Sequence, residues 1–159
     1  MRPPPFAPEP LDDQGRYVRD RNGGHVWHRC AHRTLYADTD RSNMVYHANY
    51  LRYFEMGRAT LMRDAAYPYR AIEESGYVYP VVDLGITFYA PLRYDDPLWI
   101  HTRPAELERV RLRFDYLITH GETGALICRG FTKHCALNAS GTPAAIDPKT
   151  VHLWNTFPR

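Results

Sequence analysis

The chain has 159 residues, of which 44% are hydrophobic and 24% charged; these are the proportions of a soluble globular domain and exclude wholesale disorder. Twenty Lys and Arg residues stand against eighteen Asp and Glu with no run of like charge, and no apolar stretch reaches the ~18–20 residues that cross a bilayer, so we expect neither a nucleic-acid partner nor a membrane span. Cys30, Cys128 and Cys135 lack CxxC spacing and are expected to be free thiols, and with no recognisable signal peptide the sequence predicts a cytoplasmic protein.

The N-terminal segment is expected to be a flexible arm over residues 1–24. Five prolines stand among its first ten residues, and polar and glycine residues follow. Proline removes backbone donors and fixes φ, which disfavours regular structure. We therefore place one folded domain at residues 25–147 and a tail or short helix at residues 148–159.

A strand is expected over residues 26–37 and a turn over residues 38–43. The segment from residue 45 to residue 66 then runs without proline and predicts a long helix of about nineteen residues, which is roughly 28 Å. Its apolar face carries Tyr50, Phe54, Gly57 and Leu61. On another side of this helix we expect ion pairs, or a subunit contact, among Arg52, Glu55 and Arg58.

The rest of the chain is predicted to be short helices and strands in a meander. A short helix over residues 70–76 precedes strands near residues 78–90, 98–102, 112–119 and 125–138, with a last short helix near residues 148–154. One strand, one long helix and an antiparallel meander predict the α+β class, with a curved sheet packed on a single helix.

Acidic and hydrogen-bonding groups meet where the turn joins the long helix. Asp40 stands before the helix, and His47 is expected in its first turns. The first N–H groups of a helix lack partners and carry partial positive charge, so they can stabilise an oxyanion while a carboxylate attacks an acyl carbon or activates water. The alternatives are an ordinary helix cap for Asp40, a core position for His47, and for Asp38 an arginine partner or a weak cation site.

The segment YADTDRSNMVYHANYLRYFEMGR resembles the signature of the 4-hydroxybenzoyl-CoA thioesterase family, whose relatives include the thioesterases associated with the Tol-Pal system. The resemblance extends over residues 26–146. The positions that carry it are Tyr36, Asp38, Asp40, Met44, Val45, Tyr46, His47, Asn49, Tyr50, Glu55 and Arg58.

The resemblance implies a hotdog fold, an acyl-CoA substrate, no cofactor or metal, and a homodimer or homotetramer with active sites at subunit interfaces. It places Asp40, expected to be buried, as the catalytic carboxylate and the backbone N–H of His47 against the thioester carbonyl. The remaining substrate-binding candidates are Asn43, Val45, Tyr46 and Asn49. The family usually has glycine where Asn43 stands, and asparagine tolerates the left-handed conformation that glycine would supply there.

Three readings of function remain open at this stage. The first is hydrolysis of an acyl-CoA, with Asp40 as nucleophile or general base. The second is a non-catalytic acyl-CoA-binding hotdog protein, a sensor or scaffold, and the third a hotdog dehydratase. Candidates for the CoA phosphates are Arg103, Arg111, Arg113, Arg129 and Lys133, and candidates for the acyl pocket are Tyr77, Tyr79, Phe88 and Tyr89.

Overall fold

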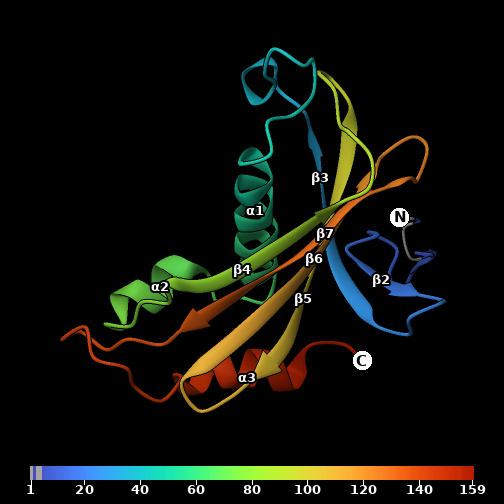
Figure 1. The fold of residues 1–159 in the computed structure, drawn as a ribbon. Coiled ribbons are helices and arrows are strands. Elements are labelled where there is room, and N and C mark those ends of the chain that lie inside the picture. The colour runs from blue at the N-terminus through green and yellow to red at the C-terminus, as the bar shows by residue number, and fades with distance from the viewer. Residues whose placement is uncertain (1, 3–4) are drawn as a thin grey trace.

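A seven-stranded antiparallel sheet dominates the computed structural model, which describes residue 2 and residues 5–159. The strands lie in the order β1-β2-β3-β5-β6-β7-β4 (Figure 1). Their bounds are β1 Pro8–Pro10, β2 Tyr17–Asp20, β3 Val26–Arg33, β4 Val81–Phe88, β5 Pro97–Leu107, β6 Arg111–His120 and β7 Leu126–Cys135. The helices are α1 Asn49–Asp64, α2 Tyr69–Glu74 and α3 Pro148–Thr156, with a 3-10 turn at Tyr36–Asp38. None of the helices in the described part of the chain has the length and apolar character needed to traverse a bilayer.

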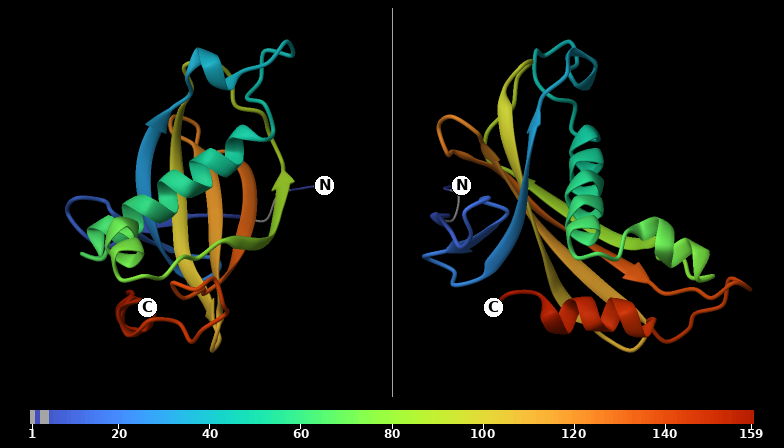
Figure 2. Two further views of the ribbon diagram at one scale, coloured as in Figure 1. Left: turned by 90° about the vertical axis from the view of Figure 1, so that its left-hand side faces the viewer. Right: turned by 180° about the vertical axis from the view of Figure 1, so that it is seen from behind.

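The long helix α1 lies against one face of the sheet, and α3 lies across the sheet's lower end (Figures 1 and 2). Alternation along β6 produces this face, because Leu112, Phe114, Tyr116 and Ile118 are all buried. The ring of Phe54 on α1 stacks on Tyr116 with centroids 4.3 Å apart. The α+β class and the hotdog arrangement are therefore confirmed.

Close contact between α1 and β5 depends on a glycine. A Cβ atom added at Gly57 would stand 2.6 Å from Cγ2 of Ile100, well inside van der Waals contact. The sequence-based interpretation of this glycine as a point of close approach is confirmed.

The N-terminal segment differs from the flexible arm expected over residues 1–24. Residues 8–20 contribute β1 and β2, which pair with each other and extend the sheet beyond β3. Val18 is completely buried, and Phe6 packs on His101 with ring centroids 4.8 Å apart. The prolines fit because β1 is an edge strand, where a missing N–H donor costs little. Residues 1, 3 and 4 of the expected arm lie outside the described residues.

The start of α1 and the C-terminal segment differ in detail from the sequence-based predictions. The helix α1 begins at Asn49, four residues later than expected, because the N–H groups of Val45 and Tyr46 donate to the carbonyls of Leu92 and Asp38 instead. At the other end of the chain the segment expected as a tail or short helix is α3. Asp147 caps it by accepting from the N–H of Thr150 at 3.1 Å.

Candidate active site

A tight loop carries Asp40 to the start of α1. Thr39 and Val45 form an isolated antiparallel bridge, and the N–H of Asp40 donates to the carbonyl of Met44 at 3.0 Å. The chain can turn between them because Asn43 has a φ of 61°, in the left-handed region that asparagine tolerates better than most residues. The predicted tolerance of Asn43 for this conformation is confirmed, and its side chain is exposed.

Asp40 is exposed in the single chain, where the sequence predicted burial. Its Oδ1 accepts from the N–H of Ser42 at 2.8 Å and also from the Ser42 hydroxyl. These bonds, with the nearby His47, hold the pKa of the Asp40 carboxyl below its usual value. The carboxylate is therefore ionised at neutral pH, and its other oxygen is free of protein donors in the described residues.

Two backbone donors precede the first helical residue. Within the described part of the chain, the N–H groups of His47 and Ala48 donate to no acceptor, whereas the N–H of Asn49 already donates to the carbonyl of Tyr46. His47 is exposed and lies two residues before α1, outside the first turn in which it was expected. Unpaired donors at a helix start are suited to an oxygen that gains negative charge.

Asp38 holds the inner side of this loop, through partners that the sequence did not indicate. It is 4% exposed, and its Oδ2 accepts from the hydroxyl of Tyr53 at 2.8 Å and from the N–H of Leu35 at 3.0 Å. The side-chain amide of Asn49 donates to the Asp38 carbonyl at 2.8 Å. Oδ2 of Asp38 therefore has two hydrogen-bond donors without the arginine or the cation considered from the sequence. Through these bonds Asp38 positions the loop.

The other predicted substrate contacts divide into buried and exposed residues. Val45 is 6% exposed and belongs to the hydrophobic core, so its side chain forms no open wall in the single chain. Tyr46 is 44% exposed and its ring lies 4.3 Å from that of His47, centroid to centroid. The structure therefore groups Asp40, Asn43, Tyr46 and His47 at one exposed corner of the molecule.

The charged residues of α1 do not form the expected ion pairs. Among the described residues, none of Arg52, Glu55 and Arg58 pairs with a carboxylate or a cation. Instead Nη1 of Arg58 donates to Oη of Tyr116 at 3.1 Å. The helix places Arg58 over the sheet, where a hydroxyl is nearer than a carboxylate.

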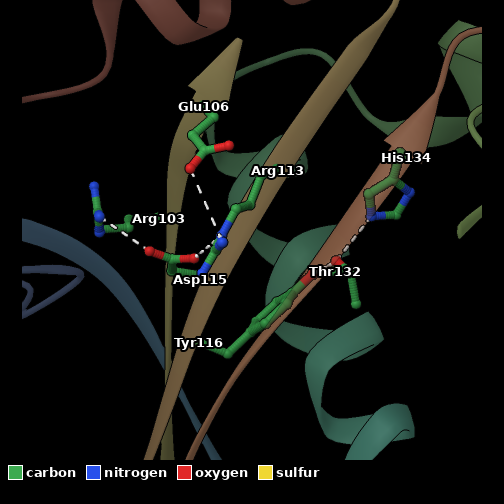
Figure 3. Close-up of polar contacts among 7 residues, drawn as sticks. All are labelled: Arg103, Glu106, Arg113, Asp115, Tyr116, Thr132 and His134. Atoms are coloured by element: carbon green, nitrogen blue, oxygen red, sulfur yellow. Dashed lines mark hydrogen bonds and ion pairs between the residues drawn. The ribbon is translucent and has the colours of Figure 1, made fainter. Parts of the chain in front are cut away.

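A directed chain of hydrogen bonds continues from Tyr116 under α1 (Figure 3). Burial lowers the pKa of His134 to about 4, so its ring is neutral at pH 7. Its Nδ1 must donate to the Tyr79 carbonyl, 2.9 Å away, because a carbonyl only accepts. Its Nε2 then accepts from Oγ1 of Thr132 at 2.8 Å, and Thr132 in turn accepts from Tyr116 at 2.7 Å.

The arginines considered for CoA phosphates lie mainly on the opposite face of the sheet. Arg103 and Arg113 both contact Asp115, at 3.0 and 2.7 Å (Figure 3). With Arg129 they line an outer hollow of about 550 Å³. The intervening carboxylate neutralises much of the charge there. These residues are remote from the corner that carries Asp40, because α1 and its loop lie on the inner face.

Comparison with known proteins identifies the family. Residues 34–152 match the family model described as the Thioesterase-like superfamily. The chain belongs to this superfamily. It is 31% identical to a putative acyl-CoA thioesterase, YneP, of Bacillus subtilis (strain 168), over 76% of this chain and 87% of that protein. It is also 31% identical to the acyl-CoA thioester hydrolase YbgC of Escherichia coli O157:H7, over 59% and 70%.

Solved structures of this superfamily share the fold. A probable thioesterase from Bartonella henselae superposes with a TM-score of 0.71 at 30% identity, covering 76% of this chain and 99% of that one. The family that the segment Tyr36–Arg58 resembles is therefore confirmed.

Sequence reasoning missed two contributors to the corner. Ser42 binds Asp40 through both its N–H and its hydroxyl, and the order Asp-x-Ser is the pattern of an Asx-turn, so a local signal existed. Tyr53 reaches Asp38 from the second turn of α1, and no local pattern predicts that long-range bond.

Proposed function

We propose that this enzyme hydrolyses an acyl-CoA thioester to the free acid and CoA at the corner formed by residues 40–48. One observation carries the proposal: the loop that presents the ionised carboxylate of Asp40 also presents the two unpaired N–H groups of His47 and Ala48. The names of the relatives, acyl-CoA thioesterase and acyl-CoA thioester hydrolase, support the same substrate class.

The unpaired N–H groups would bind the thioester carbonyl oxygen. As the carbonyl carbon becomes tetrahedral, negative charge develops on that oxygen, and preorganised donors stabilise it. Loss of one such donor in other enzymes costs about 3–4 kcal/mol of transition-state stabilisation. His47 contributes through its backbone in this scheme, so its imidazole is not required for the step.

Asp40 would act by one of two routes. As nucleophile, its carboxylate oxygen bonds to the acyl carbon, the C–S bond breaks, CoA thiolate leaves and takes a proton from solvent, and water then hydrolyses the mixed anhydride. As general base, it takes a proton from the water that attacks the acyl carbon; the C–S bond then breaks, and the CoA thiolate leaves and takes that proton from Asp40. Both routes return Asp40 to its ionised form, and both are completed by the chain's own groups and water.

A second copy of the chain would close this site, making the functional unit a homodimer or a pair of dimers. The edge strand β4 supports this, because its side chains are exposed on both faces: Val81 42%, Val82 54%, Leu84 43% and Phe88 47%. An unpaired, apolar edge strand favours pairing with another strand. Two β4 strands paired antiparallel about a two-fold axis would make one continuous sheet.

The same pairing accounts for the exposure of Asp40. Phe88 ends β4 and packs on Tyr50 in the first turn of α1, with ring centroids 5.0 Å apart, so the corner lies beside the proposed interface. A partner there would exclude water and strengthen the interaction between the carbonyl and its donors. A cytoplasmic location belongs to the proposal as well, supported by the three unpaired cysteines, Cys30, Cys128 and Cys135.

The decisive experiment measures thiol release from a panel of acyl-CoA substrates by wild type and Asp40→Asn. We expect the substitution to lower kcat by about 10²–10⁴-fold, because the amide neither attacks nor takes a proton. The exposed Asp13→Asn is the matched control and should behave as wild type. Equal rates for wild type and Asp40→Asn would refute the role of Asp40.

The same panel separates the alternative functions. Binding of acyl-CoA by wild type without thiol release would indicate a non-catalytic acyl-CoA-binding protein. Formation of an unsaturated thioester and water from a hydroxyacyl-CoA, with CoA still attached, would indicate a dehydratase.

A further inference from the structure

A cavity of about 310 Å³ lies between α1, α2, α3 and the inner face of the sheet, away from the corner that carries Asp40. Its buried end is formed by Met62, Ile72, Leu112, Phe114 and Trp154, each 8% exposed or less. The members that remain exposed are Glu55 on α1, Tyr69 at the start of α2, and Pro80 and Val81 where β4 begins. The cavity is therefore closed at α3 and opens toward the edge of the sheet.

The buried end suits an apolar ligand. Most polar side chains there already bond to protein groups: both ring nitrogens of His134 are engaged, and the hydroxyls of Tyr79 and Thr150 donate to Asp147 at 2.5 and 2.6 Å. Among the described lining residues the exception is the indole N–H of Trp154, which is buried without a partner. The walls that remain are aliphatic and aromatic carbon. An apolar cavity of about 150 Å³ holds benzene with its six carbons, so this one holds roughly twelve carbons.

α3 forms the floor of the cavity and is firmly held. Trp154 packs on Phe114 with ring centroids 4.9 Å apart. The N-terminal end of α3 is fixed by Asp147, which accepts from the hydroxyls of Tyr67 and Tyr79 as well as from Thr150. Trp154 also lies beyond residue 152, where the match to the superfamily model ends. The part of the floor that Trp154 forms therefore lies outside that match, although α3 begins inside it.

The opening does not face the catalytic corner of the same chain. Ala59, in the cavity wall, lies ten residues along α1 from Asn49, its first residue, which is about 15 Å of helix. Val81 at the opening and Phe88 beside the corner are seven steps apart on β4, which is about 24 Å. Antiparallel pairing of two β4 strands about their centre sets Val81 of one copy against Phe88 of the other. The opening then lies beside the partner's helix start.

We propose that this cavity holds the alkyl chain of an acyl-CoA whose thioester lies at the start of α1 in the partner subunit, and that Trp154 sets the longest chain accepted. The inference rests on the proposed hydrolase function and on the β4 dimer. It assigns a medium-chain acyl group, up to about twelve carbons, as the substrate class.

The first test compares kcat/KM over saturated acyl-CoAs from two to eighteen carbons. Wild type should rise by up to about fourfold per CH₂ group until the cavity is full and then fall. Trp154→Ala opens the floor and should move the maximum to longer chains, whereas Ala59→Phe fills the cavity and should move it to shorter ones. Leu153→Ala is the control, because Leu153 is buried on α3 but does not line the cavity, and its profile should match wild type.

The outcomes separate this inference from the function on which it rests. Thiol release with unchanged chain-length profiles in both cavity variants overturns the inference and leaves the hydrolase function standing. If wild type releases no thiol, the hydrolase function fails. Binding of non-hydrolysable acyl-CoA thioethers then decides the cavity: affinities whose chain-length dependence shifts with Trp154→Ala support the assignment, and affinities that do not shift refute it.

A mixed dimer tests the role of the partner. One copy carries Asp40→Asn and the other Ala59→Phe, with different affinity tags, and the substrate is a twelve-carbon acyl-CoA. If each site combines Asp40 of one chain with the cavity of the other, the two substitutions lie in the same site. The second site is then intact, so about half of the wild-type activity remains. If each cavity serves its own chain, both sites are defective and no activity remains, which would overturn the arrangement. The two homodimeric variants, both expected to be inactive on this substrate, are the controls.

Discussion

Nε2 of His28 lies 2.7 Å from Oδ2 of Asp64, which ties the middle of the sheet to the last residue of α1. The His28 ring is fully buried, and burial lowers its pKa in spite of the carboxylate beside it. Burial likewise lowers the pKa of His101 to about 3 and that of His134 to about 4. These three histidines are therefore neutral in the folded protein at pH 7.

We predict that stability falls as the pH falls below about 6.5, the pKa of an unfolded histidine. Below that value the unfolded chain binds protons that the buried rings do not, so acid favours unfolding. The loss should approach about 1.4 kcal/mol per pH unit for each such histidine. Urea denaturation at pH 7.5, 6.5 and 5.5 measures it, and His101→Gln should reduce the slope. A free energy of unfolding that is constant over this range contradicts the prediction.

Gly57→Ala should destabilise the fold although alanine favours helices. The added methyl group would stand 2.6 Å from Ile100, so α1 and β5 must separate. Overpacking of this kind costs about 1–3 kcal/mol. Guanidinium denaturation should show a lower midpoint with an unchanged slope. Arg52→Ala, on the exposed side of the same helix, is the control and should change stability by less than about 0.5 kcal/mol.

Asp147→Ala should loosen α3. The carboxylate accepts from two tyrosine hydroxyls and from both the N–H and the hydroxyl of Thr150, and these bonds outweigh its burial and lower its pKa. Its loss leaves buried donors unsatisfied, at about 1–3 kcal/mol for each uncompensated group. Tyr67→Phe, which removes one bond, should cost only about 1 kcal/mol. Amide exchange in residues 150–156 should rise in Asp147→Ala; protection equal to wild type would count against the capping role.

Local patterns predicted a large part of this structure. The alternation of Leu112, Phe114, Tyr116 and Ile118 predicted β6 because one face of that strand is buried and the other is not. Gly57 predicted a close approach of the helix to the sheet, because a glycine in mid-helix is destabilising unless close packing requires it. In each case the physical cause lies within a few residues of the signal.

Long-range contacts explain what the sequence did not predict. The helix α1 begins late because Leu92, far along the chain, accepts from the N–H of Val45. Arg58 donates a hydrogen bond to Tyr116 and does not pair with Glu55. The strand β1 forms because it pairs with β2. The exposure of Asp40 was not predicted either, since no pattern in residues 38–43 reports how much of a loop side chain the rest of the fold covers.

Lysines on the edge strand should abolish the proposed dimer. Val82→Lys with Leu84→Lys places two charges where exposed apolar side chains would pair with a second β4. We expect a folded monomer by analytical ultracentrifugation, an unchanged circular dichroism spectrum and loss of thioesterase activity. Leu11→Lys, at an exposed apolar position outside β4, is the control and should leave the assembly intact. A double variant that remains dimeric would show that the chain assembles through another surface.

The backbone at Asn43 should matter more than its side chain. The residue has a φ of 61° and an exposed side chain. Left-handed geometry costs an ordinary L-residue about 1–2 kcal/mol, a cost that asparagine partly avoids and glycine escapes. Asn43→Gly should therefore change stability by less than about 0.5 kcal/mol and should retain activity. Asn43→Val should lose about 1–2 kcal/mol.

The valine variant should also lose activity, because relaxation of the turn moves Asp40, whose N–H and carbonyl both hold the same loop. Ala66→Val provides the matched comparison, since Ala66 has a φ of 62° at the opposite end of α1. It should lose similar stability without a change in kcat/KM. A different result would contradict this prediction: if Asn43→Gly raises the hydrolysis rate only for bulky acyl groups, the asparagine side chain narrows the site. The contribution of residue 43 would then come from its side chain and not from its backbone conformation.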